Sequence, residues 1–222
     1  MRRYLQGTLD FCCGVYAVLN ALSCLYSIDL QTGRKIFQQT LNEFSSFADV
    51  WPHFLRNETD HYWVIRYLLQ NRCTGAPYFV NFTQPFATGL TAGEPGAMPD
   101  FSSLYLPEEH DPSGPSSSNH RTKEAEAVWE SLHAHLAENA RHSGPYNEVA
   151  LLRFHRFLPG IPQPLVSHWT TAKAVDERAI ILHDASAEEG ALFVLDRDML
   201  FSGKIRALVR IVPESVVFLS SV

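Results

Sequence analysis

Cys13 is the residue of this chain best placed to act as a nucleophile. It stands at the start of a predicted helix over residues 11–25, where backbone N–H groups without helical partners and the helix dipole favour a thiolate. Gly14 would let the backbone approach a substrate closely, and the Gln6 amide could donate to an oxyanion together with the Cys13 N–H. The alternative for Cys13 is an inert buried thiol, a common fate of cysteines among apolar residues.

A histidine and an acid in the second half of the chain could complete this chemistry. Residues 165–184 are predicted to form a hairpin with its turn at Asp176 and Glu177. Asp176 lies midway between His168 and Asp184 in the sequence, so the two side chains would face each other with Cβ atoms about 5 Å apart. Asp184 would then accept a hydrogen bond from one imidazole nitrogen and direct the other nitrogen toward a thiol.

Both residues also have a purely structural interpretation. His168 could be a core histidine on a half-buried strand, and Asp184 a turn residue at the end of a strand. His183 competes for the role of His168, but alternation along the strand places it on the opposite face from Asp184. A register slip of one residue would reverse that choice.

The elements that would position these residues are helical in the first half of the chain and extended in the second. Helices are predicted, from apolar periodicity, over residues 11–25, 30–47, 62–69 and 123–141, the first with Asp10 as its N-cap. Strands are predicted, from β-branched and aliphatic content, over residues 78–82, 149–155, 165–174, 178–184, 191–195 and 205–212. Helices followed by strands favour an α+β fold. We expect one domain, residues 1–222, with a Pro/Gly/Ser-rich surface insertion at about 85–120.

Composition excludes several classes of protein. The 222 residues include 18 Lys and Arg and 24 Asp and Glu, a net charge of −6, which disfavours nucleic acid or an anionic membrane as a partner. Four cysteines are too few for a disulfide scaffold. The apolar run that follows Arg2 and Arg3 resembles a signal peptide, but Asp10 and Asn20 argue against it, so we expect a protein that is cytoplasmic where it is made and has no membrane span. No zinc-ligand motif occurs, and we expect neither metal nor organic cofactor.

The residues around Cys13 resemble a known motif. In order, the chain carries a glutamine, a Cys-Gly pair at a helix start, a small residue and an asparagine: Gln6, Cys13, Gly14, Ala17 and Asn20. This order resembles the nucleophile helix of the papain superfamily of cysteine peptidases. The similarity is greatest to the branch that contains the leader peptidases of bacteriocin exporters and, more distantly, phytochelatin synthase. The residue before the nucleophile, commonly acidic or polar in that branch, is a cysteine here.

His168 followed by Trp169, and later Asp184, resembles the His-aromatic and Asp elements of the same branch. The resemblance implies a papain-like fold, in which the nucleophile helix packs on a C-terminal antiparallel sheet. By this resemblance Cys13 would be the nucleophile and Gln6 the oxyanion donor. His168 would be the base and Asp184 the acid that orients it. The interval between nucleophile and base is longer here than in the leader peptidases.

These residues predict a thiol hydrolase that cleaves a peptide or isopeptide bond in a protein or peptide substrate. The same triad could transfer an acyl group to an amine or deamidate a glutamine. The alternative from another class is a catalytically inactive α+β binding module that docks through residues 85–120. Because few residues precede Gln6, we expect no blocking pro-segment and therefore narrow specificity. A processing protease would fit, as would an effector delivered into another cell and held by a cognate inhibitor.

Overall fold

The structure is a computed structural model, and it describes residues 3–5, 12–48, 51–55, 61–75, 78–86, 118–142, 145–157, 164–185, 193–201 and 209–222. Its helices are α1 (Cys13–Tyr26), α2 (Leu30–Ser45), α3 (Trp51–Leu55), α4 (Tyr62–Arg72), α5 (Ser118–Leu136) and α6 (Arg197–Phe201), with short 3-10 turns η2 (Glu138–Arg141) and η3 (Pro213–Ser215). Its strands are β1 (Thr74–Gly75), β2 (Tyr78–Thr83), β3 (Glu148–Phe157), β4 (Pro164–Val175), β5 (Ala179–Leu182), β6 (Val194–Asp196), β7 (Val209–Ile211) and β8 (Val217–Ser221).

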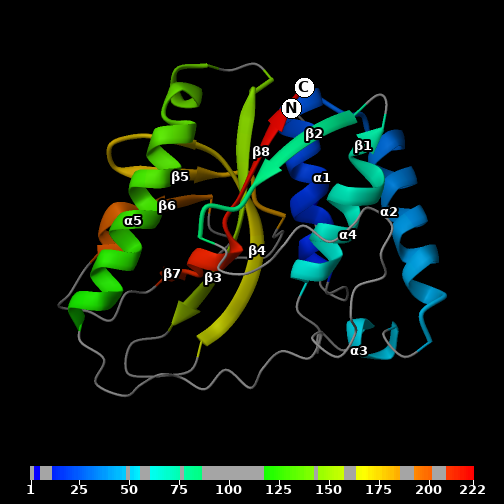
Figure 1. Cartoon of the computed structure of the whole chain (residues 1–222), viewed down its shortest axis with the longest axis horizontal. Helices are drawn as coiled ribbons and strands as arrows, with labels where there is room; N and C mark the ends of the chain where they lie inside the picture. Colours follow the sequence, from blue (N-terminus) through cyan, green and yellow to red (C-terminus); the bar gives the residue numbers. More distant parts are fainter. Residues whose placement is uncertain are drawn as a thin grey trace.

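The described strands form one sheet of eight strands, and all pairs are antiparallel. Their order is β1-β2-β8-β3-β4-β5-β6, and β7 also pairs with β3 (Figure 1). β8 and β7 lie one after the other along the edge of β3 away from β4, separated by η3. There the hydroxyl of Ser215 replaces a strand carbonyl and accepts the N–H of Arg153 at 2.8 Å. The predicted α+β class is confirmed.

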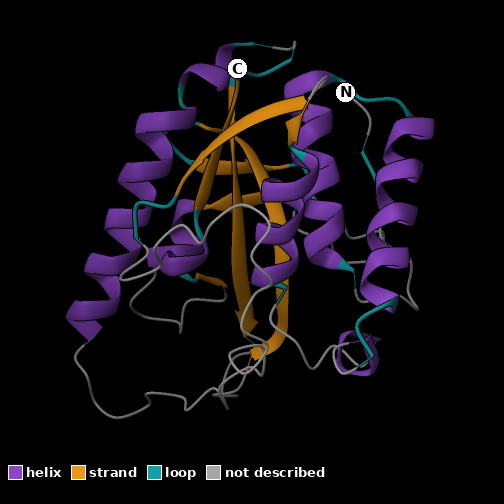
Figure 2. Ribbon diagram, turned by 45° about the vertical axis from the view of Figure 1, so that its right-hand side comes forward, coloured by secondary structure: helices purple, strands orange, loops and turns teal. Residues whose placement is uncertain are grey.

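Helices cover both faces of this sheet. Figures 1 and 2 show α5 on one side and α1, α4 and α2 on the other. Val149 and Leu151 of β3 pack with α1 and α4, whereas Ala150 and Leu152 pack with α5. Because both faces of this part of the strand are buried, residues 149–152 form a continuous apolar run without the alternation of a half-exposed strand.

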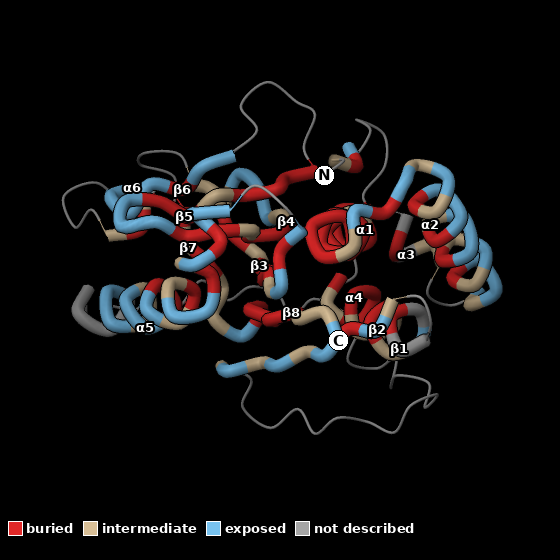
Figure 3. The backbone as a smooth tube through the Cα atoms, turned by 90° about the horizontal axis from the view of Figure 1, so that it is seen from above, coloured by how far each residue is buried: buried red, intermediate tan, exposed pale blue. Residues whose placement is uncertain are grey.

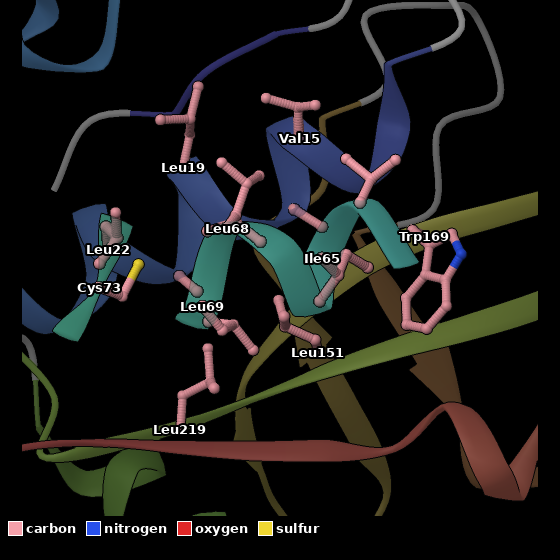
Figure 4. Packing of buried hydrophobic residues seen from close by; sticks show 14 of the residues in the cluster. Val15, Leu19, Leu22, Ile65, Leu68, Leu69, Cys73, Leu151, Trp169 and Leu219 are labelled. Carbon is pink, nitrogen blue, oxygen red and sulfur yellow. The ribbon is translucent and has the colours of Figure 1, made fainter. Parts of the chain in front are cut away.

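The helix predicted over residues 11–25 is α1, and it lies between β4 of the sheet and α2 (Figure 3). Every residue of α1 except Tyr16 and Tyr26 is buried, as expected for a helix that is apolar all round. Val15, Leu19 and Leu22 belong to one apolar cluster with Ile65 and Leu68 of α4 and with Leu151 and Leu219 of the central strands (Figure 4).

Several predicted boundaries differ from the structure. The N-cap of α1 is Cys12 and not Asp10, which lies outside the described residues. The predicted helix 123–141 begins earlier, at Ser118, and its last turn is the separate η2. The remaining predicted helices and strands are present as α2, α4 and β2 to β7.

Strand β8 was not predicted, although Pro213 and Ser215 separate its apolar stretch from the predicted strand 205–212. Most of the predicted insertion at 85–120 lies outside the described residues. In the described ranges, no helix is both long and apolar enough to cross a bilayer.

Candidate active site

Cys13 is the first residue of α1, and only 8% of it is exposed. At this position its backbone N–H has no helical carbonyl to donate to. The hydroxyl of Thr171, on β4, donates to the carbonyl of Ala17 at 2.8 Å and ties α1 to that strand. Because β4 also carries His168, this bond fixes the start of α1 against the strand that supplies the candidate base.

His168 lies between the thiol and a carboxylate. Its Nε2 is 2.8 Å from Oδ1 of Asp184, and both side chains are buried, 12% and 1% exposed. Because Nε2 is used in this way, Nδ1 is the nitrogen left for the hydrogen bond between His168 and the Cys13 thiol. The structure therefore brings Cys13, His168 and Asp184 together in one series of contacts.

The hairpin that joins His168 to Asp184 turns one residue later than predicted. Its loop is Glu177 and Arg178, closed by a hydrogen bond from the Asp176 N–H to the Ala179 carbonyl at 3.0 Å. The Asp176 carboxylate also accepts the N–H groups of Arg178 and Ala179, at 2.7 and 2.8 Å. An aspartate that accepts from the following backbone stabilises such turns, which explains why the loop follows Asp176 and is not centred on it.

A bulge in β4 also changes the predicted register. Beyond the bulge Ala172 faces Leu182, so continuing the ladder past β5 would place Asp184 opposite Thr170. The contact with His168 is therefore diagonal, at a separation that long side chains can bridge. The prediction that Asp184 contacts His168 is confirmed, but the two residues do not lie directly opposite each other.

The charges of the site stabilise one another. Burial alone would raise the pKa of the Cys13 thiol, but the charge of His61 and the hydrogen bonds with His168 and His61 hold this pKa well below its usual range. Burial alone would lower the pKa of His168, but its hydrogen bonds with Asp184 and Cys13 raise it to about 10. The site thus favours a thiolate and an imidazolium over the neutral pair.

The other thiols differ from Cys13 in their electrostatics. All four cysteines are free and buried. Burial raises the pKa of Cys24 to about 12 and that of Cys73 to about 12. These two residues belong to the apolar core and have the inert character that was the alternative for Cys13.

The structure adds His61, a residue that the sequence analysis did not single out. Its Nδ1 lies 3.5 Å from Sγ of Cys13 and accepts the N–H of Gly14 at 3.1 Å. A Cβ on residue 14 would lie 2.8 Å from Cβ of His61, so the glycine gives room to this histidine. No motif surrounds His61, and only the folded arrangement of α4 beside α1 brings it to the thiol.

The predicted oxyanion donor Gln6 lies outside the described residues, and its role stays a prediction. Nearby, the buried Asn20 binds the backbone of Tyr4 twice. The Tyr4 N–H donates to Oδ1 of Asn20 at 2.8 Å, and Nδ2 of Asn20 donates to the Tyr4 carbonyl at 3.1 Å. This reciprocal pair holds the chain two residues before Gln6 against the helix that begins at Cys13.

The described ranges contain no cluster of three or more His, Cys, Asp or Glu side chains suited to a metal ion. Comparisons of the chain with family models, with curated proteins and with solved structures found no match.

Proposed function

We propose that this protein is a papain-like thiol hydrolase that cleaves an amide bond through Cys13, His168 and Asp184. The observation that carries the proposal is the buried series of contacts from the thiol to His168 and on to Asp184, with 2.8 Å between imidazole and carboxylate. A nucleophile, an adjacent base and a third group that orients the base are the parts that covalent catalysis requires. The resemblance of the flanking residues to the papain superfamily supports the same assignment.

The first half of the reaction forms an acyl-enzyme. The Cys13 thiolate attacks the carbonyl carbon of the amide, and the electrons of the carbonyl bond move to its oxygen. The Cys13 N–H, at the helix start, and the Gln6 amide would donate hydrogen bonds to that oxyanion. When the intermediate collapses, the carbon–nitrogen bond breaks, and the leaving amine takes the proton of the His168 imidazolium.

The second half releases the acid. Neutral His168 accepts a proton from water as the water oxygen attacks the thioester. The carbon–sulfur bond then breaks, and the thiolate of Cys13 reforms beside the imidazolium. Asp184 holds the imidazole in one orientation throughout and stabilises its positive charge.

The proposal is tested by incubating the protein with a complex mixture of peptides and following the products by mass spectrometry. We expect new peptide ends that have gained the elements of water, and no such ends with Cys13→Ala. Cys24→Ala, which removes another buried thiol of the same helix, is the matched control and should retain turnover. Full activity in Cys13→Ala would rule out the assigned nucleophile.

The same spectra distinguish the other uses of the triad. Conversion of a glutamine to glutamate without a new end would indicate deamidation, and a new amide bond with loss of ammonia would indicate acyl transfer. Absence of every product, in protein that is natively folded, would contradict the hydrolase and favour a binding module.

A further inference from the structure

His61 contacts the sulfur that the proposed mechanism uses. Its Nδ1 lies 3.5 Å from Sγ of Cys13, within hydrogen-bond distance of a sulfur, and 3.1 Å from the backbone nitrogen of Gly14. The side chain is 3% exposed, so water does not screen this contact well. The described titratable side chains around the sulfur are His61 and His168, with Asp184 behind the second histidine.

The position of His61 is built into the packing of three elements. It is the N-cap of α4, and its ring stacks on Phe54 of α3, with centroids 5.4 Å apart and planes at 27°. The next residue, Tyr62, stacks on Trp169, the residue after His168, with centroids 6.1 Å apart. The chain segments that carry the two histidines are therefore held together by the aromatic residues beside them.

We propose that His61 is a second imidazole partner of the Cys13 thiolate, a positioning residue that holds and stabilises the nucleophile. In the neutral state the single lone pair of Nδ1 accepts the Gly14 N–H. When the sulfur is ionised, His61 takes up a proton at Nδ1, which ends the bond from Gly14, and the new N–H group donates to the thiolate. A charge-assisted hydrogen bond of this kind in a buried site strongly favours the ionised sulfur.

His168 and His61 have different roles. His168 is bonded to Asp184 and moves protons during the reaction, whereas Nδ1 of His61 lies against the thiol and the Gly14 N–H. His61 acts through the sulfur and sets the pH range in which Cys13 is a thiolate. This inference deepens the proposed function and rests on it for the role of Cys13 as nucleophile.

The test is the pH profile of Cys13 alkylation by iodoacetamide in His61→Asn. Asparagine places an oxygen near the position of Nδ1 and still accepts the Gly14 N–H, but it cannot carry a positive charge. We expect the acid limb of the profile to move to higher pH. A shift of one pKa unit slows alkylation about tenfold at pH values below the native acid limb. His135→Asn is the matched control, because this histidine on α5 bonds Glu148 and lies on the other side of the sheet from α1. Its profile should equal that of the native protein.

An unchanged acid limb in folded His61→Asn would show that His61 only packs, and it would overturn the inference. A second measurement needs no substitution: alkylating Cys13 removes the negative charge, so the nitrogen-15 NMR signal of His61 Nδ1 should move toward its unprotonated form at constant pH. A signal that stays in place would equally contradict the inference. If His61→Asn shifts the profile but the peptide mixture gives no product, the proposed function is wrong, whereas the role of His61 as a partner of the Cys13 thiolate is supported.

Discussion

At the scale of single residues, the site depends on two buried charges that would each be unfavourable alone. Burial disfavours both a thiolate and an imidazolium, and only their mutual contact and the Asp184 carboxylate reverse this. The ionised pair exists above the lowered pKa of Cys13 and below the pKa of His168, about 10. Activity that requires the pair should therefore have an acid limb well below the usual range of thiols and an alkaline limb near 10.

Asp184→Asn should narrow this pH range from both sides. The carboxylate raises the pKa of His168, so its loss lets His168 release its proton at lower pH, and the alkaline limb moves down. Without Asp184 to hold it, His168 also stabilises the thiolate of Cys13 less, so the acid limb moves to higher pH. A peptidyl epoxide measures both limbs, because its ring opening needs the thiolate and a proton donor together. If the pKa of His168 falls by one unit from about 10, inactivation of Cys13 by this reagent at pH 9 should slow about twofold, because the protonated fraction falls from about nine tenths to one half.

Asp176→Asn is the matched control for that substitution, because Asp176 lies at the exposed turn of the same hairpin. Its two limbs should coincide with those of the native protein. The account of Asp184 would be wrong if Asp184→Asn left both limbs in place while the fold was intact.

The sequence allowed some of these residues to be predicted, and the reason differs from one to the next. His168 and Asp184 could be paired because they lie within one hairpin, where the register relates sequence to contact directly. Cys13 could be singled out because a helix start has a defined electrostatic character. His61 could not be found, because its contact with Cys13 depends on how two helices pack, and packing leaves no local signal.

At the scale of elements, the link between α1 and β4 decides whether nucleophile and base meet. The Thr171 hydroxyl donates to the Ala17 carbonyl at 2.8 Å in the buried core. The adjacent Thr170 is equally buried, but its hydroxyl has no hydrogen-bond partner within the described ranges. The two threonines form a natural pair for testing the importance of this bond.

Thr171→Val should lower the free energy of unfolding by about 1 kcal/mol, the usual net contribution of a hydrogen bond. Thr170→Val should leave this free energy unchanged or raise it, because it removes a buried hydroxyl that has no described partner. Urea unfolding followed by circular dichroism measures both values. Equal losses in the two variants would show that the bond between α1 and β4 contributes nothing specific.

The elements themselves were predicted unevenly. Helices α1, α2 and α4 have the apolar patterns of buried and amphipathic helices and were placed to within a few residues. The bulge in β4 was not predicted, since one extra residue leaves the apolar pattern of a strand nearly unchanged. β8, which lies between β2 and β3 in the sheet, was also not predicted.

At the scale of the whole molecule, the central strands join two hydrophobic clusters. Leu151 packs in the cluster with α1 and α4, and the next residue, Leu152, in the cluster with α5, both without exposed surface. A substitution that destabilises one cluster should therefore also destabilise the other, because β3 belongs to both. The order of the strands depends on contacts between residues that are far apart in the sequence. The local sequence pattern therefore predicted the α+β class but not this order.

Leu151→Ala and Leu152→Ala should each cost about 2–5 kcal/mol, the usual range for a fully buried leucine. If the chain is one domain, both variants should unfold in a single transition, with the same midpoint by circular dichroism and by tryptophan fluorescence. Two separate transitions in either variant would show that the clusters are independent units and would contradict the single-domain prediction.

The central claim is that Cys13 is an activated nucleophile, and site-resolved alkylation of the native protein between pH 4 and 9 tests it most directly. Fragment spectra are needed, because Cys12 and Cys13 are adjacent in one peptide. The account predicts that below pH 7 Cys13 is labelled far faster than Cys24 and Cys73, and that His168→Ala removes this advantage. If Cys13 is not labelled until the protein unfolds, it is a core thiol and the proposed hydrolase is wrong.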